Sequence, residues 1–216
     1  MLKVGLTGSI AVGKSYVCEV LRELGAFVLD ADRTAREVVE RGTAGLRRIV
    51  EHFGAEILQP NGELDRARLG AIVFADERRR QLLNSIVHPL VFEAQNDWLR
   101  KRERENPHKI AVIDAALMIE SGSYKRFNKL IVVWCEPEIQ LQRLVSRDNL
   151  SEAEALRRIN AQMSQQEKKR YADFLIDTSA GFPTARTQTI EIFERLKLFN
   201  KKNQNTKEAK SRSRRK

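Results

Sequence analysis

One short stretch near the N-terminus limits the fold more than any other feature of this chain. Residues 8–15 read GSIAVGKS, which matches GxxxxGK[ST], and they lie between an apolar run at 2–7 and a helical pattern at 14–24. This pattern, after a strand and before a helix, is typical of a loop whose backbone N–H groups surround a phosphate. The glycines permit the tight wrap, and the start of the helix adds partial positive charge. The sequence therefore predicts a strand–loop–helix unit that binds a nucleotide.

The side chains of this loop indicate which nucleotide it holds. We expect Lys14 to reach the β- and γ-phosphates and the Ser15 hydroxyl to ligate Mg²⁺. No [NT]KxD-like sequence, which would read guanine, follows the apolar run at 129–135, where WCEPEIQ stands instead, so ATP is favoured. The alternative reading is a glycine-rich turn with an accidental lysine. The predicted nucleotide-binding residues are Gly8, Ala11, Val12, Gly13, Lys14, Ser15 and Tyr16.

Apolar runs and helical patterns alternate along the chain, which favours an α/β fold with a parallel sheet. The runs are short and almost continuously apolar, as expected for strands that are covered on both faces. We predict strands at 2–7, 26–30, 109–114, 129–135 and 172–177.

The remaining segments divide the chain into a core and attachments. Helical patterns at 44–53, 65–74, 76–87 and 90–104, the last two separated by Pro89, fill an insert between the second and third strands. A polar helical hairpin that begins with a capping box, Ser151 and Glu154, has the character of a mobile lid. The predicted parts are a nucleotide-binding core at 1–42, 107–145 and 172–198, a helical insert at 43–106, a lid at 146–171 and a basic tail at 199–216.

The net charge of +10 comes mostly from the C-terminus. Residues 201–216 hold eight Lys or Arg and one Glu, so the other 200 residues carry only +3. Such a composition predicts a disordered, solubilising tail. The alternative is a weak, salt-sensitive contact with RNA or another polyanion.

Cysteine usage and hydropathy favour a cytoplasmic protein. Cys18 and Cys135 lie far apart, outside any metal-binding spacing, and read as core residues in a reducing compartment. The apolar run LIVVWC is far too short to cross a bilayer, and MLKVGLTGSI lacks the apolar stretch of a secretory signal. We therefore expect no membrane partner.

Aspartates stand at the C-terminal ends of two predicted strands. In folds of this type, ligands bind at that edge of the sheet. Asp30 and Asp32 follow the second strand, and Asp32 could accept a hydrogen bond from an acceptor hydroxyl or simply cap the next helix. Asp114 ends the third strand, where it could hold a Mg²⁺-bound water or bond to loop amides.

An ordered series of segments resembles the dephospho-CoA kinase family. The segments span residues 1 to about 198, and the P-loop is the strongest single motif. They are GLTGSIAVGKS, VLDADRTAREVV, HFGAEIL, NGELDRARL, IVHPLVFEA, LVSRDNLSEAEALRRINAQ and ADFLIDT. The resemblance implies a P-loop fold like that of nucleoside monophosphate kinases, with a CoA-binding helical domain and a lid.

The same resemblance implies an activity and a set of residues. The expected enzyme phosphorylates the ribose 3′-hydroxyl of dephospho-CoA with ATP and Mg²⁺, which is the last step of coenzyme A synthesis. Asp32 corresponds to the family's acidic residue at that hydroxyl, and Arg66 and His88 lie on the substrate side, although His88 also reads as a packed histidine at a helix start. Arg143 and Arg147 resemble arginines at the lid hinge that neutralise the phosphoryl group. Asp32, Lys14 and Arg143 are thus the predicted catalytic residues.

Departures from the family pattern leave other readings open. Ser9, Ala11 and Val12 replace residues of a glycine-rich loop, so a positive φ at Ala11 would be strained. Ala116 stands where a proline is common, and Thr178 where asparagine is common. The alternatives are a kinase of another small hydroxyl or nucleotide, and a nucleotide-dependent RNA-binding protein that uses its tail.

Overall fold

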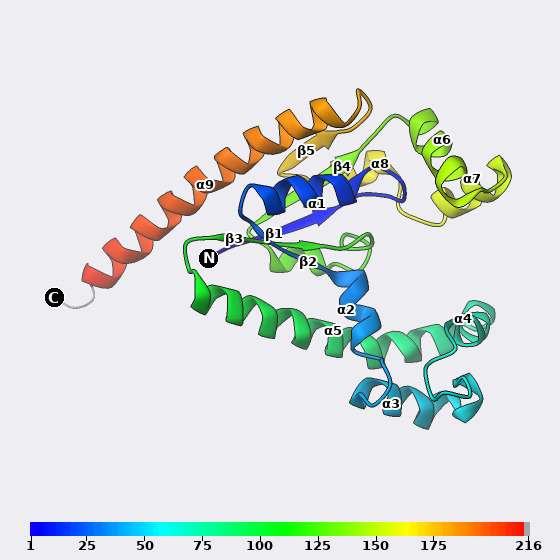
Figure 1. Cartoon of the computed structure of the whole chain (residues 1–216). Coiled ribbons are helices and arrows are strands. Elements are labelled where there is room, and N and C mark those ends of the chain that lie inside the picture. The colour runs from blue at the N-terminus through cyan, green and yellow to red at the C-terminus, as the bar shows by residue number, and fades with distance from the viewer. Residues whose placement is uncertain (214–216) are drawn as a thin grey trace. The chain divides into compact units, whose positions relative to one another are not determined.

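A computed structural model describes the backbone of residues 1–213 and the side chains of residues 1–204 (Figure 1). Five strands form one sheet in the order β2-β3-β1-β4-β5, and the pairs β1–β3, β1–β4 and β4–β5 are parallel. The strands are β1 (Leu2–Thr7), β2 (Phe27–Asp30), β3 (Ile110–Asp114), β4 (Lys129–Trp134) and β5 (Phe174–Asp177). The predicted α/β fold with a five-stranded parallel sheet is confirmed.

Helices and short 3-10 turns connect the strands. The helices are α1 (Lys14–Glu23), α2 (Ala31–Glu37), α3 (Ala44–Phe53), α4 (Arg66–Ala75), α5 (Glu77–Glu105), α6 (Pro137–Asp148), α7 (Glu152–Asn160), α8 (Gln165–Lys169) and α9 (Phe182–Ser213). The 3-10 turns are η1 (Ala55–Ile57) and η2 (Ser123–Arg126).

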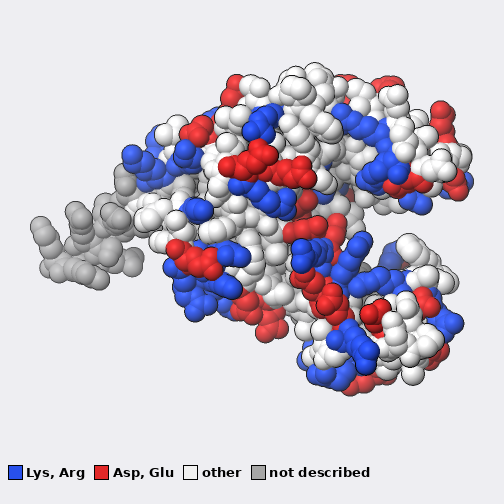
Figure 2. Space-filling view, viewed as in Figure 1, with Lys and Arg blue, Asp and Glu red and all other residues white. Residues whose placement is uncertain are grey.

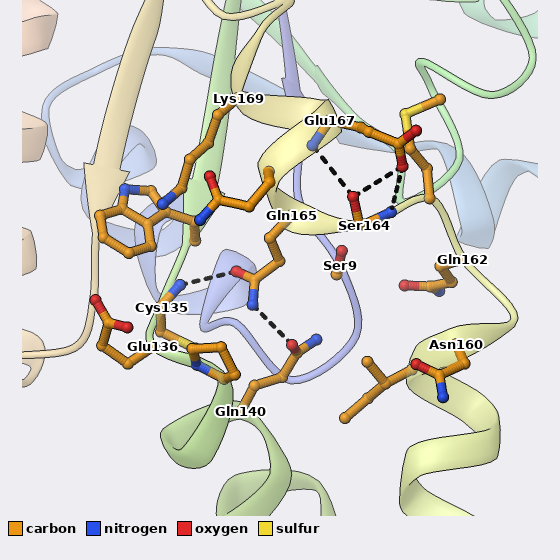
Figure 3. Close-up of a pocket in the computed structure, with 15 residues that line it drawn as sticks. Ser9, Cys135, Glu136, Gln140, Asn160, Gln162, Ser164, Gln165, Glu167 and Lys169 are labelled. Carbon is orange, nitrogen blue, oxygen red and sulfur yellow. Dashed lines mark hydrogen bonds between the residues drawn. The ribbon is translucent and has the colours of Figure 1, made fainter.

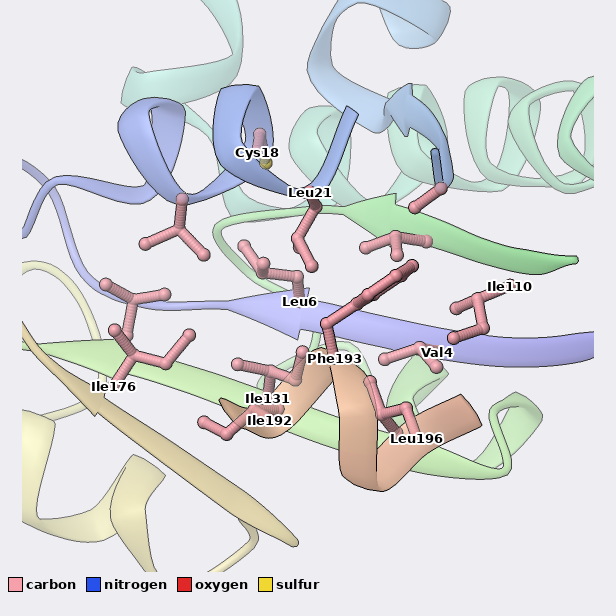
Figure 4. Packing of buried hydrophobic residues seen from close by; sticks show 14 of the residues in the cluster. Val4, Leu6, Cys18, Leu21, Ile110, Ile131, Ile176, Ile192, Phe193 and Leu196 are labelled. Atoms are coloured by element: carbon pink, nitrogen blue, oxygen red, sulfur yellow. The ribbon is translucent and has the colours of Figure 1, made fainter. Parts of the chain in front are cut away.

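The sheet is covered on both faces, which explains its apolar strands. On one face, side chains of α1 and α9 pack against β1, β3 and β4, with Leu21, Phe193 and Leu196 at the centre (Figure 4). On the other face, a Cβ added at Gly5 would lie 2.5 Å from the Met118 Sδ, so a larger residue at this strand position would require the Met118 side chain to move.

The chain divides into two compact units. The first comprises Met1–Leu29 and Arg102–Lys216 and contains the P-loop and most of the sheet, and the second is Asp30–Lys101. The second unit has its own core, in which Ile49, Phe53 and Ile57 are almost fully buried. The unit begins at Asp30, and therefore includes α2, whereas the sequence suggested an insert that begins at residue 43.

One expectation about the helices of this second unit is wrong. The patterns at 76–87 and 90–104 form a single helix, α5, with Pro89 inside it. Proline removes one backbone hydrogen bond and crowds the preceding turn. Here Ile86 and Val91 are buried on either side of Pro89, and packing of these side chains outweighs that local cost.

Two helices begin at the caps that the sequence predicts. The Asp65 side chain accepts a hydrogen bond from the Arg68 amide at 2.9 Å and begins α4. Ser151 and Glu154 form the expected capping box of α7. A second capping box, Ser164 with Glu167, begins α8.

The C-terminal segment differs from the disordered tail that we expected from residue 199. Residues 199–213 continue α9. The buried Asn200 donates a hydrogen bond from Nδ2 to the His108 carbonyl at 2.7 Å, and Phe199 packs against the core, so the start of the segment is held in place. Lysine, which occurs four times in it, is a good helix former, as are its single glutamine and alanine. Residues 214–216 lie outside the described part of the chain.

Charged side chains of both signs are interspersed on the face shown in Figure 2, in keeping with the small net charge of residues 1–200. Among the described residues, none of the helices has the length and hydropathy needed to traverse a bilayer.

Candidate active site

The P-loop takes the conformation that a phosphate site requires. Gly13 precedes α1 with φ 87° and forms no side-chain cap, as in helices whose first N–H groups point toward a bound anion. Ala11 has φ 61°, which confirms the expected strain at a residue that carries a Cβ. At Gly8, an added Cβ would lie 2.4 Å from the Val133 carbonyl oxygen, so only glycine fits where the loop leaves β1.

Lys14 and Asp114 form an ion pair beside this loop. The Lys14 Nζ lies 2.9 Å from the Asp114 Oδ1, and only 15% of the lysine side chain and 12% of the aspartate side chain are exposed. The pair results from sheet register, because Asp114 ends β3 opposite Leu6 of β1. Asp114 thus contacts the P-loop lysine, a partner that neither sequence-based reading of this residue included.

The two cysteines are buried thiols, as the sequence predicts. The Cys18 Sγ donates a weak hydrogen bond to the Asp114 Oδ2 at 3.5 Å. Burial, with the nearby Asp114 charge, raises the pKa of Cys18, and burial also raises the pKa of Cys135. Both groups therefore stay protonated at neutral pH and lack the thiolate character of a nucleophile.

A second set of side chains lies next to the P-loop at the end of β5. The hydroxyl of the fully buried Thr178 donates to the Val12 carbonyl at 2.9 Å. Arg143 donates to the Thr178 hydroxyl and to the Thr178 carbonyl, both at 2.8 Å. Phe182 stacks on Tyr16 at 4.5 Å between ring centroids, and the Arg143 guanidinium lies 5.6 Å from the Phe182 centroid. Thr178, which the sequence marked only as a departure, therefore ties Arg143 to the phosphate loop.

Three other arginines of the predicted lid region lie at its surface. Arg147 makes two hydrogen bonds to the neighbouring Asp148, and Arg158 contacts the same carboxylate at 3.1 Å. The hydrogen bonds and charge of Arg147 lower the pKa of Asp148. Arg157 and Arg158 are exposed, in agreement with a solvated helix face.

A cavity of about 460 Å³ lies between the start of α6, the end of β4 and the α7–α8 connection (Figure 3). Glutamine side chains form much of its wall and bond to the backbone. The Gln162 Oε1 accepts from the Ile10 amide at 2.9 Å, and the Gln140 Nε2 donates to the Ile10 carbonyl at 2.8 Å. Ser9 also lines the cavity, and its buried hydroxyl has no hydrogen-bond partner among the described residues.

Lys168 of α8 is the largest fully buried side chain of the described residues. Its Nζ donates to the Ala116 carbonyl at 2.8 Å and pairs with the Glu120 Oε1 at 2.8 Å. Burial lowers the pKa of Lys168, and the hydrogen bond and charge of Glu120 oppose that shift. Lys168 thus connects the lid segment to the loop after β3.

The residues predicted to contact the acceptor substrate lie in the second compact unit. Asp32 is exposed in the first turn of α2, and the helix cap is Asp30, whose Oδ1 accepts from the Asp32 and Arg33 amides. Arg66 donates to the Arg36 carbonyl and lines a smaller cavity. His88 lies inside α5, with its ring 6.2 Å from the Phe92 ring, and does not open a helix.

Oxygen atoms that a magnesium ion could use lie beside the P-loop. Within the described residues, no group of three or more His, Cys, Asp or Glu side chains lies close enough to hold a metal ion. Mg²⁺ commonly binds through one or two protein oxygens together with phosphates and water. The Ser15 hydroxyl, in the first turn of α1, and the Asp114 carboxylate are oxygen ligands of the type that Mg²⁺ accepts.

Sequence reasoning missed the polar side chains that support the P-loop and the loop after β3. Gln140, Gln162, Gln165 and Lys168 carry no motif of their own, and Lys168 lies in a segment that reads as polar and basic. The second capping box, Ser164 with Glu167, was the available signal for Gln162, Gln165 and Lys168, because it locates the start of α8.

Comparison with known proteins assigns the chain to a family. The family model described as dephospho-CoA kinase matches residues 2–184. A dephospho-CoA kinase of Listeria monocytogenes is 44% identical over 195 residues, covering 89% of this chain and 96% of that protein. A dephospho-CoA kinase of Bacillus cereus is 43% identical over 196 residues, covering 91% and 98%.

Solved structures agree with this assignment. The structure of dephospho-CoA kinase from Campylobacter jejuni has a TM-score of 0.70 and 28% identity, and the match covers 92% of this chain and 98% of the other. TT1252 from Thermus thermophilus has a TM-score of 0.75 and 29% identity, with coverage of 88% and 95%. On the evidence of the family model and of relatives that match over nearly their full length, this chain belongs to the dephospho-CoA kinase family.

Proposed function

We propose that this chain transfers the γ-phosphoryl group of ATP to the 3′-hydroxyl of dephospho-CoA and so produces coenzyme A. The observation that carries the proposal is a P-loop in phosphate-binding form, with Gly13 at φ 87° before an uncapped helix and Lys14 alongside, in a chain that the dephospho-CoA kinase family matches over residues 2–184. Phosphoryl transfer needs positioning and charge neutralisation more than covalent catalysis, and such a loop supplies both.

On the donor side, we assign the phosphates of ATP to the backbone N–H groups of residues 11–16. The Lys14 ammonium adds a full positive charge, and Asp114 holds it beside the loop until the phosphates arrive. Tyr16 and Phe182 present stacked rings next to this loop.

Mg²⁺ fits the oxygen ligands at this end of the sheet. The Ser15 hydroxyl would hold the ion together with phosphate oxygens, and Asp114 would hold one of its water ligands. When bound, the ion neutralises charge that develops on the phosphate oxygens.

On the acceptor side, we propose Asp32 as the group that takes the proton of the ribose hydroxyl. Its position supports this role, because Asp30 supplies the cap of α2 and Asp32 is exposed in the first turn. A carboxylate in that role contributes about 10²- to 10⁴-fold in rate. Arg66 and His88 are proposed substrate-binding residues of the same unit, and Arg66 lines a cavity in it.

Arg143 is proposed as the arginine that stabilises charge on the transferring group. Two of its N–H groups bind Thr178, which in turn bonds to the P-loop, so the guanidinium is fixed beside the phosphate site. A fixed guanidinium loses less conformational freedom when it meets a phosphate than a mobile one does.

A coupled ADP-release assay tests the proposal. The purified chain with ATP and Mg²⁺ is measured with and without dephospho-CoA, and the mass of the product is determined. We expect ADP release that depends on dephospho-CoA and a product heavier by one phosphoryl group. ADP release that RNA stimulates and dephospho-CoA does not would contradict the proposal and favour an RNA-dependent role.

A further inference from the structure

Two glutamines hold the backbone of one P-loop residue from opposite sides. The Ile10 N–H donates to the Gln162 Oε1 at 2.9 Å, and the Ile10 C=O accepts from the Gln140 Nε2 at 2.8 Å. Both peptide groups that flank Ile10 are therefore fixed by side chains from outside the loop. We name Gln140, Gln162 and Gln165 the glutamine brace.

The third glutamine extends these contacts to the end of β4. The Gln165 Nε2 donates to the Gln140 Oε1 at 2.7 Å, and the Gln165 Oε1 accepts from the Cys135 amide at 3.0 Å (Figure 3). For Gln140 and Gln165, each amide oxygen meets a donor and each NH₂ group meets an acceptor, so only one orientation of these two side-chain amides satisfies all partners. Gln140 is 2% exposed, which protects these bonds from competition with water.

The braced residue immediately precedes the strained one. Ala11 has φ 61°, a conformation that is costly for any residue with a Cβ. The φ angle of Ala11 is the rotation about its N–Cα bond. The peptide plane on the N-terminal side of that bond contains the Ile10 carbonyl. Gln140 holds that plane and Gln162 holds the one before it, so the two glutamines restrict the backbone on the N-terminal side of Ala11.

The brace also connects the loop to the predicted lid. Gln162 lies in the connection between α7 and α8, and Gln165 is the first residue of α8. The same segment is attached to the loop after β3, because the Met163 amide donates to the Glu120 Oε1 at 3.2 Å and Lys168 bonds to Ala116 and Glu120. The segment thus contacts both the P-loop and the loop after β3.

We propose that Gln162 is a positioning residue that keeps the P-loop of this chain in its nucleotide-binding conformation, which Ala11 would otherwise oppose. Nucleotide affinity therefore depends on a residue of the α7–α8 segment that has no role in the chemistry. The inference rests on the proposed function only for its nucleotide, and its test requires no acceptor substrate.

The experiment measures binding of ADP with Mg²⁺ by isothermal titration calorimetry. We expect Gln162→Leu, which removes the acceptor of the Ile10 amide, to weaken ADP binding about tenfold, because a lost hydrogen bond with a stranded partner is of this size. Gln166→Leu is the matched control. Gln166 is an exposed glutamine of the same segment that also lines the cavity, and we expect its substitution to leave the affinity within about twofold of the parent.

A second background separates positioning from general damage. With Ala11→Gly, positive φ costs little, so the effect of Gln162→Leu should shrink to about threefold or less. Circular dichroism and thermal unfolding confirm that each variant is folded.

Two results would overturn the inference. One is ADP affinity of Gln162→Leu equal to that of Gln166→Leu. The other is a loss of the same size in the Ala11 and Ala11→Gly backgrounds, which would show that Gln162 supports general structure. If ADP binding behaves as expected but dephospho-CoA is not phosphorylated, the brace stands and the proposed acceptor fails.

Discussion

The contact between Thr178 and the P-loop provides a sharp test of how this site is held together. The Thr178 hydroxyl donates to the Val12 carbonyl at 2.9 Å and accepts from Arg143 at 2.8 Å, and the residue is fully buried. Valine has nearly the shape of threonine but neither donates nor accepts. Thr178→Val therefore removes both bonds without creating a large cavity.

The expected loss of stability follows from the two groups that lose a hydrogen-bond partner. The Val12 carbonyl becomes a buried acceptor without its partner, which costs about 1–3 kcal/mol. Arg143 is only half-buried, so water satisfies part of its lost bond and we count it at about 1 kcal/mol. The sum is about 2–4 kcal/mol of unfolding free energy, which for a chain of this length lowers Tm by about 5–15 °C.

Differential scanning calorimetry measures this change against Thr187→Val. Thr187 is exposed on α9 and bonds only within that helix, to the Pro183 carbonyl at 3.3 Å, so its substitution should change stability by about 0.5 kcal/mol or less. ADP affinity should fall in Thr178→Val alone, since Val12 belongs to the P-loop. Equal Tm values for the two variants would refute the assignment of Thr178 as the tie between Arg143 and the loop.

Three further predictions concern the chemistry and pH dependence. Asp32→Asn should lower kcat by about 10²-fold or more while ADP binding in calorimetry is unchanged, and unchanged kcat would rule out its role as the base. Lys14→Ala should weaken ADP binding at least about tenfold and also destabilise the fold, because it strands the carboxylate of Asp114; retained affinity would contradict the phosphate contact. For Cys18, the folded-state pKa lies above the ordinary 9.0, so above pH 9.0 the unfolded chain loses this proton first and stability falls with rising pH. We therefore compare the free energy of unfolding of the parent with that of Cys18→Ala, both measured by urea unfolding. The difference between them should be constant below pH 8. Above pH 9, the parent should lose up to about 1.4 kcal/mol per pH unit relative to the variant. Lys168 is present in both proteins, and its lowered pKa makes stability rise with pH instead of fall, so its contribution cancels in the difference. A difference that stays flat to pH 10.5 would refute the burial argument.

Local patterns predicted the parts of the fold that depend on neighbours in sequence. The P-loop, the five strands, the cap at Asp65 and the capping box at Ser151 each depend on a few adjacent residues. The strain at Ala11 was predictable for the same reason, since it concerns one residue in a known loop. The break at Pro89 was wrong because burial of Ile86 and Val91, which depends on distant partners, decides whether a helix continues.

By itself, then, the sequence determined that this chain has a P-loop in a parallel α/β sheet and a family resemblance that points to Asp32, Lys14 and Arg143. Only the tertiary structure decided which side chains support that loop. Asp114 meets Lys14 because β3 lies beside β1, Thr178 meets Val12 across 166 positions, and Gln162 meets Ile10 across 152. A glutamine or threonine at such a position looks like any other polar residue in the sequence, because its partner is a backbone group that has no sequence signature and comes near only when the sheet and helices have packed.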